Sequence, residues 1–190
     1  MENCQCPVCG SEAKRIKEKG EYFYYKCGSC RVIFISPEVM CQVDEGKGII
    51  TYNNSYWNEE LRAARTRSWG TSLARVAEVF LYARLPIRKF VDIGSGPGYL
   101  LDALSYQLPS STGIFYAQEL FPPAPEFCTD NKNYNKGNLT DFSTSFDAGC
   151  CIEVIEHLTP SMVKGLFNDL AKSSRENSIY IFNTGLVEYI

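Results

Sequence analysis

The sequence predicts an α/β protein in which a doubly wound, mostly parallel sheet of five strands follows a small cysteine-rich segment. Two observations carry this prediction. From residue 89 onward, short apolar runs alternate with helical stretches, a pattern typical of parallel strands joined by right-handed crossovers. Before residue 37, four cysteines stand in two closely spaced pairs. The 190 residues are enough for one or two domains of ordinary size.

The composition excludes several classes of protein. Hydrophobic residues make up 45% and charged residues 22% of the chain, which argues against a disordered tail, a collagen-like rod and a coiled coil. No run approaches the roughly 20 apolar residues of a membrane helix. The first residues, MENCQCPVCG, lack the apolar stretch of a secretory signal. We therefore expect a cytoplasmic protein whose nine cysteines remain thiols or bind metal.

The cysteine pairs predict a structural zinc site. Seventeen residues separate Cys6-Pro-Val-Cys9 from Cys27-Gly-Ser-Cys30, a spacing typical of a zinc ribbon. Each pair brings two thiolates to one point, and two pairs complete a closed tetrahedral shell around Zn²⁺. The aromatic run 22–25 and the apolar run 32–35 are predicted strands of this ribbon. We interpret the aromatic run as packing rather than as a base-stacking surface, because the segment is not basic overall.

The chain divides into three predicted parts. Residues 1–37 form the zinc ribbon, residues 38–88 a linker and an amphipathic helix, and residues 89–190 the α/β domain. Pro37 and the glycines and asparagines of 46–48 and 52–55 mark the linker. Apolar residues then recur at helical spacing from Trp57 to Leu81, and Pro86 ends this helix.

Residues 89–190 contain the predicted sheet. Its five strands are expected at 89–93, 112–119, 133–137, 148–154 and 178–182. A helix is predicted over 99–107, and Thr159-Pro160 is typical of the cap and first turn of another.

A glycine-rich turn at 94–98, Gly-Ser-Gly-Pro-Gly, joins the first predicted strand to a helix. Glycines allow a ligand to approach the backbone, and the helix start offers free N–H groups to an anion. The turn is not a dinucleotide fingerprint, because Tyr99 stands where its third glycine would fall, and no P-loop lysine follows. Glu119 ends the second strand, where a carboxylate can accept both hydroxyls of a ribose.

With these motifs the sequence resembles the class I S-adenosylmethionine-dependent methyltransferases, from about residue 89 to the end. VDIGSGPG is similar to their first motif, residues 137–142 lie where the family holds adenine, and EVIEHL is similar to the end of their fourth-strand motif. Asn138 replaces the more usual aspartate at the adenine position. The resemblance implies a Rossmann-like sheet that binds S-adenosylmethionine. The cofactor-binding residues that it implies are Asp92, Gly94, Ser95, Gly96, Gly98, Glu119, Asn138, Leu139 and Ile152.

Glu153, Glu156 and His157 are the candidate catalytic residues. His157 is the single histidine of the chain, and histidine is the side chain whose ordinary pKa lies near neutrality. The stretch also resembles ubiquinone-pathway and small-RNA O-methyltransferases, in which a Glu-x-x-Glu-His group ligates a divalent metal. Two interpretations stay open. In the first, the three residues act as a base or as ligands of a divalent metal. In the second, they shape the cofactor pocket and cap the next helix.

Charge and the N-terminal resemblance bear on the partners. CPVCG, YKCGSC and FISP look like a bacterial-style subgroup with a zinc ribbon before the methyltransferase domain, whose members often act on small molecules or sugar-derived metabolites. Residues 90–190 carry seven more acidic than basic side chains, whereas proteins that bind phosphate backbones are usually basic. We expect a small-molecule acceptor methylated on O, N or C, and neither nucleic acid nor a membrane as partner.

Two alternatives to this function remain. One is an RNA methyltransferase that docks RNA with its ribbon, and the other is a non-catalytic protein that binds S-adenosylmethionine. Eight residues follow the fifth predicted strand, whereas the family's sheet continues with a helix and two more strands. We therefore expect a fold that is incomplete at its C-terminus. Whether the truncated chain is catalytically active stays open. The fifth strand would have a free edge, which favours a dimer.

Overall fold

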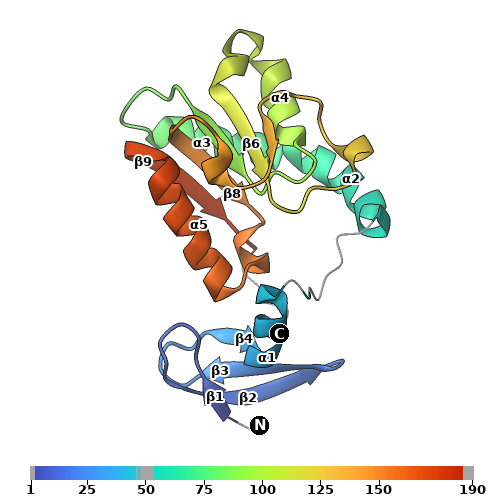
Figure 1. Cartoon of the computed structure of the whole chain (residues 1–190), viewed down its shortest axis with the longest axis vertical. Coiled ribbons are helices and arrows are strands. Elements are labelled where there is room, and N and C mark those ends of the chain that lie inside the picture. The colour runs from blue at the N-terminus through green and yellow to red at the C-terminus, as the bar shows by residue number, and fades with distance from the viewer. Residues whose placement is uncertain (1–2, 46, 48–53, 186–190) are drawn as a thin grey trace. The chain divides into compact units, whose positions relative to one another are not determined.

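The chain forms two compact units in a computed structural model that describes residues 3–45, 47 and 54–185. The first unit comprises Met1–Thr51 with Leu158–Lys164, and the second comprises Tyr52–His157 with Gly165–Ile190 (Figure 1). The predicted linker residues Gly46, Gly48, Tyr52 and Asn53 lie outside the described residues.

The first unit is built on an antiparallel sheet with the strand order β1-β2-β3-β4. Its strands are β1 (Asn3–Gln5), β2 (Glu12–Lys19), β3 (Tyr22–Cys27) and β4 (Ile33–Ile35), and helix α1 (Pro37–Asp44) follows them. The runs predicted at 22–25 and 32–35 correspond to β3 and β4. Strand β2 was not predicted from the sequence, because all its residues except Ala13 are exposed and it lacks the apolar alternation of a half-buried strand. Helix α1 was not predicted either, although a proline such as Pro37 is well suited to a first helical position.

The second unit confirms the predicted fold class: five parallel strands in the order β7-β6-β5-β8-β9. The strands are β5 (Phe90–Ile93), β6 (Phe115–Glu119), β7 (Tyr134–Lys136), β8 (Phe146–Ile152) and β9 (Ser174–Asn183). The helices are α2 (Asn54–Ser68), α3 (Thr71–Tyr82), α4 (Tyr99–Gln107) and, from Gly165 onward, α5 (Pro160–Ser173), with short 3₁₀ turns at Pro109–Ile114, Pro125–Phe127, Leu139–Asp141 and Ile155–His157.

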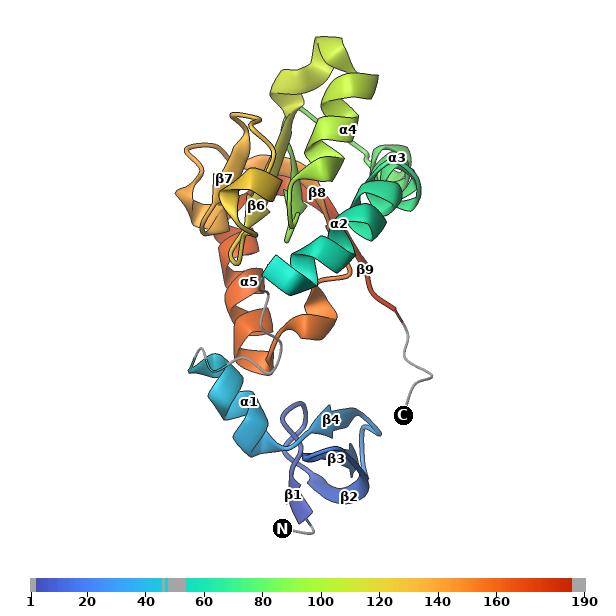
Figure 2. The same ribbon diagram turned by 90° about the vertical axis from the view of Figure 1, so that its right-hand side faces the viewer.

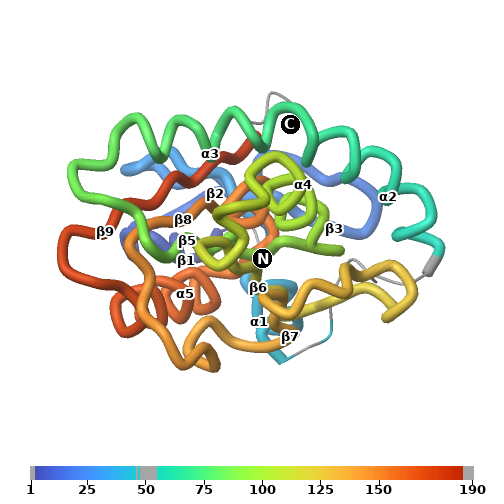
Figure 3. Tube along the Cα trace, turned by 90° about the horizontal axis from the view of Figure 1, so that it is seen from above, coloured from blue at the N-terminus to red at the C-terminus, as the bar shows by residue number. Residues whose placement is uncertain are grey.

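Helices cover both faces of the parallel sheet, because successive residues of each buried strand point to opposite sides. On one face, Phe90 of β5 packs with Val79 of α3 and Leu101 of α4. On the other face, Val91 packs with Leu170 of α5. Figure 3 shows α3 and α5 on opposite sides of the strands, and Figure 2 shows α2 alongside α3 and α4. The core therefore has two layers, one on each side of β5.

The helix predicted from Trp57 to Leu81 is two helices. The chain breaks at Gly70, where the backbone has φ −126° and ψ −99°, values that end α2 and redirect α3. The second helix ends at Tyr82, before Pro86 is reached. The prediction for α5 agrees with the structure, since the Thr159 hydroxyl accepts a hydrogen bond from the Met162 N–H as an N-cap does.

Candidate functional site

The glycine turn between β5 and α4 has a backbone that only glycine adopts easily. Gly94, Gly96 and Gly98 have φ angles of +68°, +55° and +82°. Space is also restricted, because a Cβ on Gly94 would lie 2.5 Å from Val154 Cγ2 and one on Gly98 would lie 2.4 Å from Thr129 Cγ2. Neighbouring side chains thus pack directly against the turn and fix its path.

Gly96, at the centre of the turn, is held by hydrogen bonds from two neighbouring strands. Its N–H donates to Glu119 Oε2 at 2.7 Å, and its carbonyl oxygen accepts from the Tyr134 hydroxyl at 2.6 Å. The second oxygen of Glu119 accepts from the Phe121 N–H at 2.9 Å. Burial raises the pKa of Glu119, although the backbone hydrogen bonds from Phe121 and Gly96 oppose this. The carboxylate predicted to bind ribose therefore also braces the turn.

The hydroxyl of Ser95 lies inside this turn and is buried without a hydrogen-bond partner in the part of the chain that the structure describes. Buried hydroxyls are normally paired, because an unmade hydrogen bond is costly. A polar ligand resting on the turn would satisfy this group, so Ser95 fits the cofactor site that the sequence predicts.

Asp92 is the strand-terminal acid of the first motif, and it is buried, with 5% of its surface exposed. Burial raises its pKa to about 7, the Cys150 thiol lowers it by donating to Asp92 Oδ1 at 3.4 Å, and the Glu119 charge raises it again. Asp92 thus lies on β5 just before the turn and is hydrogen-bonded to Cys150 of the neighbouring strand β8.

The residues predicted to lie beside adenine are engaged in local structure. The Asn138 side chain accepts from the Asp141 N–H, and the Asp141 carboxylate accepts from the Asn138 N–H at 2.7 Å, which makes a capping box. The Leu139 side chain belongs to the core, with 3% exposed, so only its main chain can face a ligand. Ile152 is half-buried at the end of β8.

Glu153, Glu156 and His157 follow β8 and are all exposed. Glu153 has a left-handed backbone, with φ +55°, and its N–H donates to the Asn183 carbonyl at 2.8 Å. Partial burial and the neighbouring Glu156 raise the pKa of Glu153. Within the described ranges, these three side chains do not converge as a set of metal ligands. The predicted trio is therefore adjacent in the chain but not assembled at one point.

Two residues near the turn were not identified from the sequence. Trp57 of α2 is buried, and its ring lies 3.4 Å from the position of a Cβ on Gly96. Tyr134 opens a short strand that offers little periodicity. Trp57 was placed in an apolar helical stripe, but which helix face meets a distant loop is a property of tertiary packing.

The four cysteines of the first unit lie together, as predicted. Their sulfurs are all within 4.8 Å of one another, with 3.6 Å between Cys6 and Cys30 and 3.5 Å between Cys9 and Cys27. A tetrahedron with Zn–S bonds of about 2.3 Å has sulfurs ~3.8 Å apart. The N–H of Val8 donates to Cys6 Sγ at 3.4 Å. Those of Ser29 and Cys30 donate to Cys27 Sγ at the same distance.

Charge and backbone at the cluster also suit a metal. A hydrogen bond with Ser11 lowers the pKa of Cys9 to about 6, which favours the thiolate that a metal binds. The residue after each pair has a left-handed backbone, with φ +72° at Gly10 and +63° at Arg31. The two cysteine turns therefore have the same shape. The donor set fits a closed Cys₄ metal site.

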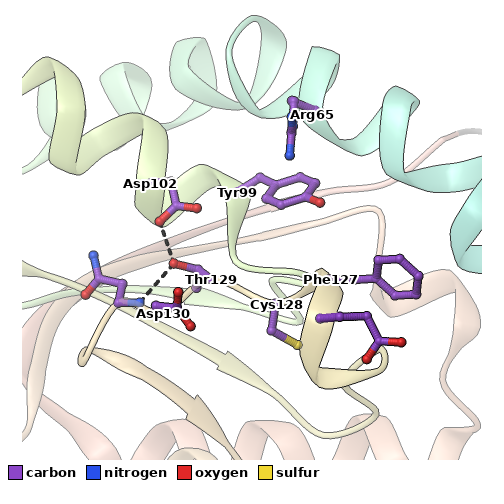
Figure 4. A pocket seen from close by; sticks show the side chains of 9 residues that line it. Arg65, Tyr99, Asp102, Phe127, Cys128, Thr129 and Asp130 are labelled. Carbon is purple, nitrogen blue, oxygen red and sulfur yellow. Dashed lines mark hydrogen bonds between the residues drawn. The ribbon is translucent and has the colours of Figure 1, made fainter.

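A pocket of about 440 Å³ lies beside the start of α4 (Figure 4). Thr129 joins it to the glycine turn, since its N–H donates to the Pro97 carbonyl at 2.8 Å and its hydroxyl donates to Asp102 at 2.5 Å. The Arg65 guanidinium lies 4.8 Å from the Tyr99 ring centre and forms one wall. The lining residues are Arg65, Tyr99, Asp102, Glu126, Phe127, Cys128, Thr129, Asp130 and Asn131.

Comparisons with known proteins give distant structural likeness. No protein-family model and no curated protein sequence matches the chain. Among solved structures, it is similar to the complex of DhpI with SAM and HEP, at 12% identity and a TM-score of 0.44, covering 81% of this chain and 70% of that one. It is also similar to the plantazolicin methyltransferase BpumL in complex with a pentazolic desmethylPZN analog and SAH, at 17% identity and a TM-score of 0.41. That match covers 67% of this chain and 50% of that one. At this distance neither ligand is carried over to this chain.

Proposed function

We propose that the second unit binds S-adenosylmethionine at the carboxyl edge of its sheet and directs methyl transfer to a small molecule. The observation that carries the proposal is the buried, unpartnered hydroxyl of Ser95 within a turn of left-handed glycines, as far as the described residues show. Ligands of open α/β sheets bind at this edge. The Gly-x-Gly-x-Gly turn with Glu119 on the adjacent strand supports a nucleoside ligand.

Each predicted residue has a role in this proposal. Glu119 accepts the ribose hydroxyls, and because a carboxylate has about four lone-pair sites, it can do so while still accepting from Gly96. Ser95 donates to the amino-acid part of the cofactor, and Asp92 supports the turn from β5. The main chain of Leu139, with Asn138, borders the adenine, and Ile152 lines the site.

Bound S-adenosylmethionine supplies a methyl group on a sulfonium, and the protein must supply position and proton transfer. We assign the proton-accepting role to the stretch that contains Glu153, Glu156 and His157, acting directly on the acceptor. Partial burial and the neighbouring Glu156 raise the pKa of Glu153, which makes its carboxylate a stronger proton acceptor than an ordinary glutamate. The acceptor in this proposal is a small molecule or sugar-derived metabolite.

The remaining proposals concern the whole chain. We propose that Cys6, Cys9, Cys27 and Cys30 hold a structural Zn²⁺, because four thiolates leave no open coordination position.

Among the described strands, β9 pairs with β8 alone, so a second copy pairing with its other edge would form a dimer. Reduced thiols favour the cytoplasm. No helix in the described part of the chain is long and apolar enough to cross a membrane.

Isothermal titration with S-adenosylhomocysteine tests the cofactor assignment. We expect micromolar binding by the wild-type chain, and at least ten-fold weaker binding by Glu119→Ala, which loses the ribose acceptor. Glu176→Ala, which removes an exposed carboxylate on β9 outside the pocket, is the matched control. Equal affinity in the wild type and Glu119→Ala would overturn the proposal. Methylation of small-molecule extracts then separates an enzyme from a non-catalytic binding protein.

A further inference from the structure

The outer face of the antiparallel sheet in the first unit carries lysines and tyrosines that the proposed methyl transfer does not use. Side chains directly opposite each other in an antiparallel pair share one face of the sheet. Ala13 lies opposite Cys27, and both are buried beside the cysteine cluster. The neighbouring pairs of β2 and β3 point to the other face. We call this the lysine–tyrosine face. Its residues from β2 and β3 are Lys14, Lys17, Lys19, Tyr22, Tyr24 and Lys26, and Ile33 and Ile35 of β4 lie on the same side, opposite Lys26 and Tyr24.

A β-bulge brings these lysines to one side. In a regular strand, Lys17 and Lys19 would share a face with Ala13 and Arg15, because side chains alternate with a period of two. The register instead slips at Ile16, so that Arg15 lies opposite Tyr25 and Lys17 lies opposite Tyr24. The slip places Lys17 and Lys19 on the same face as Lys14.

The two faces of the sheet differ in how their charges are paired. Glu18 lies opposite Phe23, on the face of the cysteine cluster, and forms an ion pair with Arg15. Arg15 in turn lies 3.7 Å over the Phe23 ring. On the lysine–tyrosine face, the acidic side chain of β2 is Glu12, at the end of the strand, which accepts a hydrogen bond from Asn3 at 2.6 Å.

The groups of this face are available to a partner. Lys14, Lys17 and Lys19 are exposed, and Tyr22, Tyr24 and Lys26 are half-buried. Within the described residues, none of the four lysines forms an ion pair. The two tyrosines stand two residues apart on β3, about 7 Å along the strand. The face therefore offers free positive charge around two spaced aromatic rings.

We infer that the lysine–tyrosine face binds a single-stranded polynucleotide. Lysines contact phosphates, and aromatic rings on a sheet surface stack with successive bases. The spacing of the two rings along β3, about 7 Å, suits stacking with successive bases, which neither an acidic protein nor an anionic membrane offers. From the sequence we expected the aromatic run to serve packing and not base stacking, because the segment is not basic overall. The face on which each charge lies is set by the register of β2 and β3. Binding at this face is independent of cofactor binding by the second unit.

Fluorescence anisotropy of the zinc-loaded full chain tests the inference, with a labelled oligouridylate about 12 nucleotides long. We expect binding that weakens with salt. Tyr22→Ala and Tyr24→Ala should each weaken binding by about 5- to 150-fold, the effect of losing one stacked base. Lys14→Ala and Lys17→Ala should each reduce the slope of log affinity against log salt by about 0.7, the loss of one phosphate contact on a single strand.

Matched controls come from the second unit. Tyr82→Ala removes a tyrosine with 65% of its surface exposed on α3, and Lys172→Ala removes an exposed lysine on α5, so both should bind as the wild type does. An oligothymidylate of the same length tells RNA from DNA. If a tyrosine variant fails to hold zinc, the charge reversal Lys17→Glu replaces it, with loss of binding expected.

Three results would overturn the inference. The first is the absence of oligonucleotide binding at low salt. The second is binding that the tyrosine substitutions leave unchanged, which indicates attraction of charge alone. The third is preferential binding to heparin or to phosphatidylserine vesicles. Titration with S-adenosylhomocysteine reports separately on the second unit, so failure of the cofactor proposal is distinguishable from failure of this one.

Discussion

The hydroxyl of Tyr134 donates a 2.6 Å hydrogen bond to the carbonyl oxygen of Gly96, and so connects β7 to the turn that follows β5. Burial raises the pKa of Tyr134 above its usual value, so this hydroxyl keeps its proton. The position of the turn therefore depends on a strand that is not adjacent to β5 in the sheet.

Tyr134→Phe should lower both stability and cofactor affinity. Loss of this hydrogen bond should reduce the free energy of unfolding by about 1 kcal/mol. S-adenosylhomocysteine should bind several-fold more weakly, because the turn is less well held. Urea unfolding and calorimetric titration measure the two effects. Tyr106→Phe, at a tyrosine with 74% exposed on α4, is the control and should change neither.

Gly98→Ala should destabilise the second unit by about 2 kcal/mol or more. The new methyl group would lie 2.4 Å from Thr129 Cγ2, on a backbone with φ +82°. Gly165→Ala makes the same chemical change inside α5 with nothing within 4 Å, and there it should stabilise by about 0.5–1 kcal/mol. Thermal and urea unfolding should give opposite signs for the two variants, and equal effects would contradict the packing described for the turn.

Asp92→Asn should change how stability depends on pH. The folded-state pKa of Asp92, raised by burial to about 7, lies above the ordinary value of about 3.9. The folded chain thus binds a proton that the unfolded chain releases, so wild-type stability falls as pH rises from about 4 to about 7. Relative to the wild type, Asp92→Asn should gain stability over this range in urea unfolding. The exposed Asp130→Asn is the control, and a pH-independent difference for Asp92→Asn would refute the assignment.

Cys27→Ser should abolish stoichiometric zinc binding and unfold the first unit. Cys6 and Cys27 are among the few buried side chains of that unit's core, together with Ala13 and Tyr25, so loss of the metal also disrupts packing. Zinc content by metal analysis and limited proteolysis should both report the change. Cys41→Ser, at an exposed thiol on α1, should retain the metal, and chelation of the wild type should reproduce the effect of Cys27→Ser.

Arg31→Gly should stabilise the zinc-bound first unit by about 0.5–1 kcal/mol. Arg31 has φ +63°, a conformation that costs a non-glycine residue about 1 kcal/mol. Gly10 occupies the same place after the other cysteine pair, with φ +72° and open space around it. Gly10→Ala should therefore destabilise by about the same amount. Resistance of the zinc site to a competing chelator measures both variants.

Local patterns predicted the secondary structure well where one periodicity dominates. Helix α4 has the predicted bounds, and each strand of the parallel sheet was found near its apolar run. The break at Gly70 was missed, because both flanking helices continue the same apolar spacing and only the packing of α3 on the sheet distinguishes them. The cysteine cluster could be predicted because two CxxC pairs at this spacing are typical of one metal site, and the four sulfurs lie together in the structure.

The candidate site was less predictable. Glycines and Glu119 stand in a recognisable order, but Tyr134 and Trp57 reach the turn from remote elements through tertiary packing. The roles expected of Asp92, Asn138 and the Glu153–His157 group depend on a bound ligand and remain predictions. Which lysines share a face of β2 depends on a register slip that alternation of residue types does not encode.

The slip at Ile16 has a consequence for how β2 tolerates changes in length. Ile16 is the extra residue, with 45% of its surface exposed and no Cα partner on β3, whereas Arg15 and Lys17 have partners on either side of it. Loss of its codon would shorten the strand by one residue and keep each of the remaining cross-strand pairs. At this one position, homologous chains could differ by a single-residue insertion or deletion and still present the same surface.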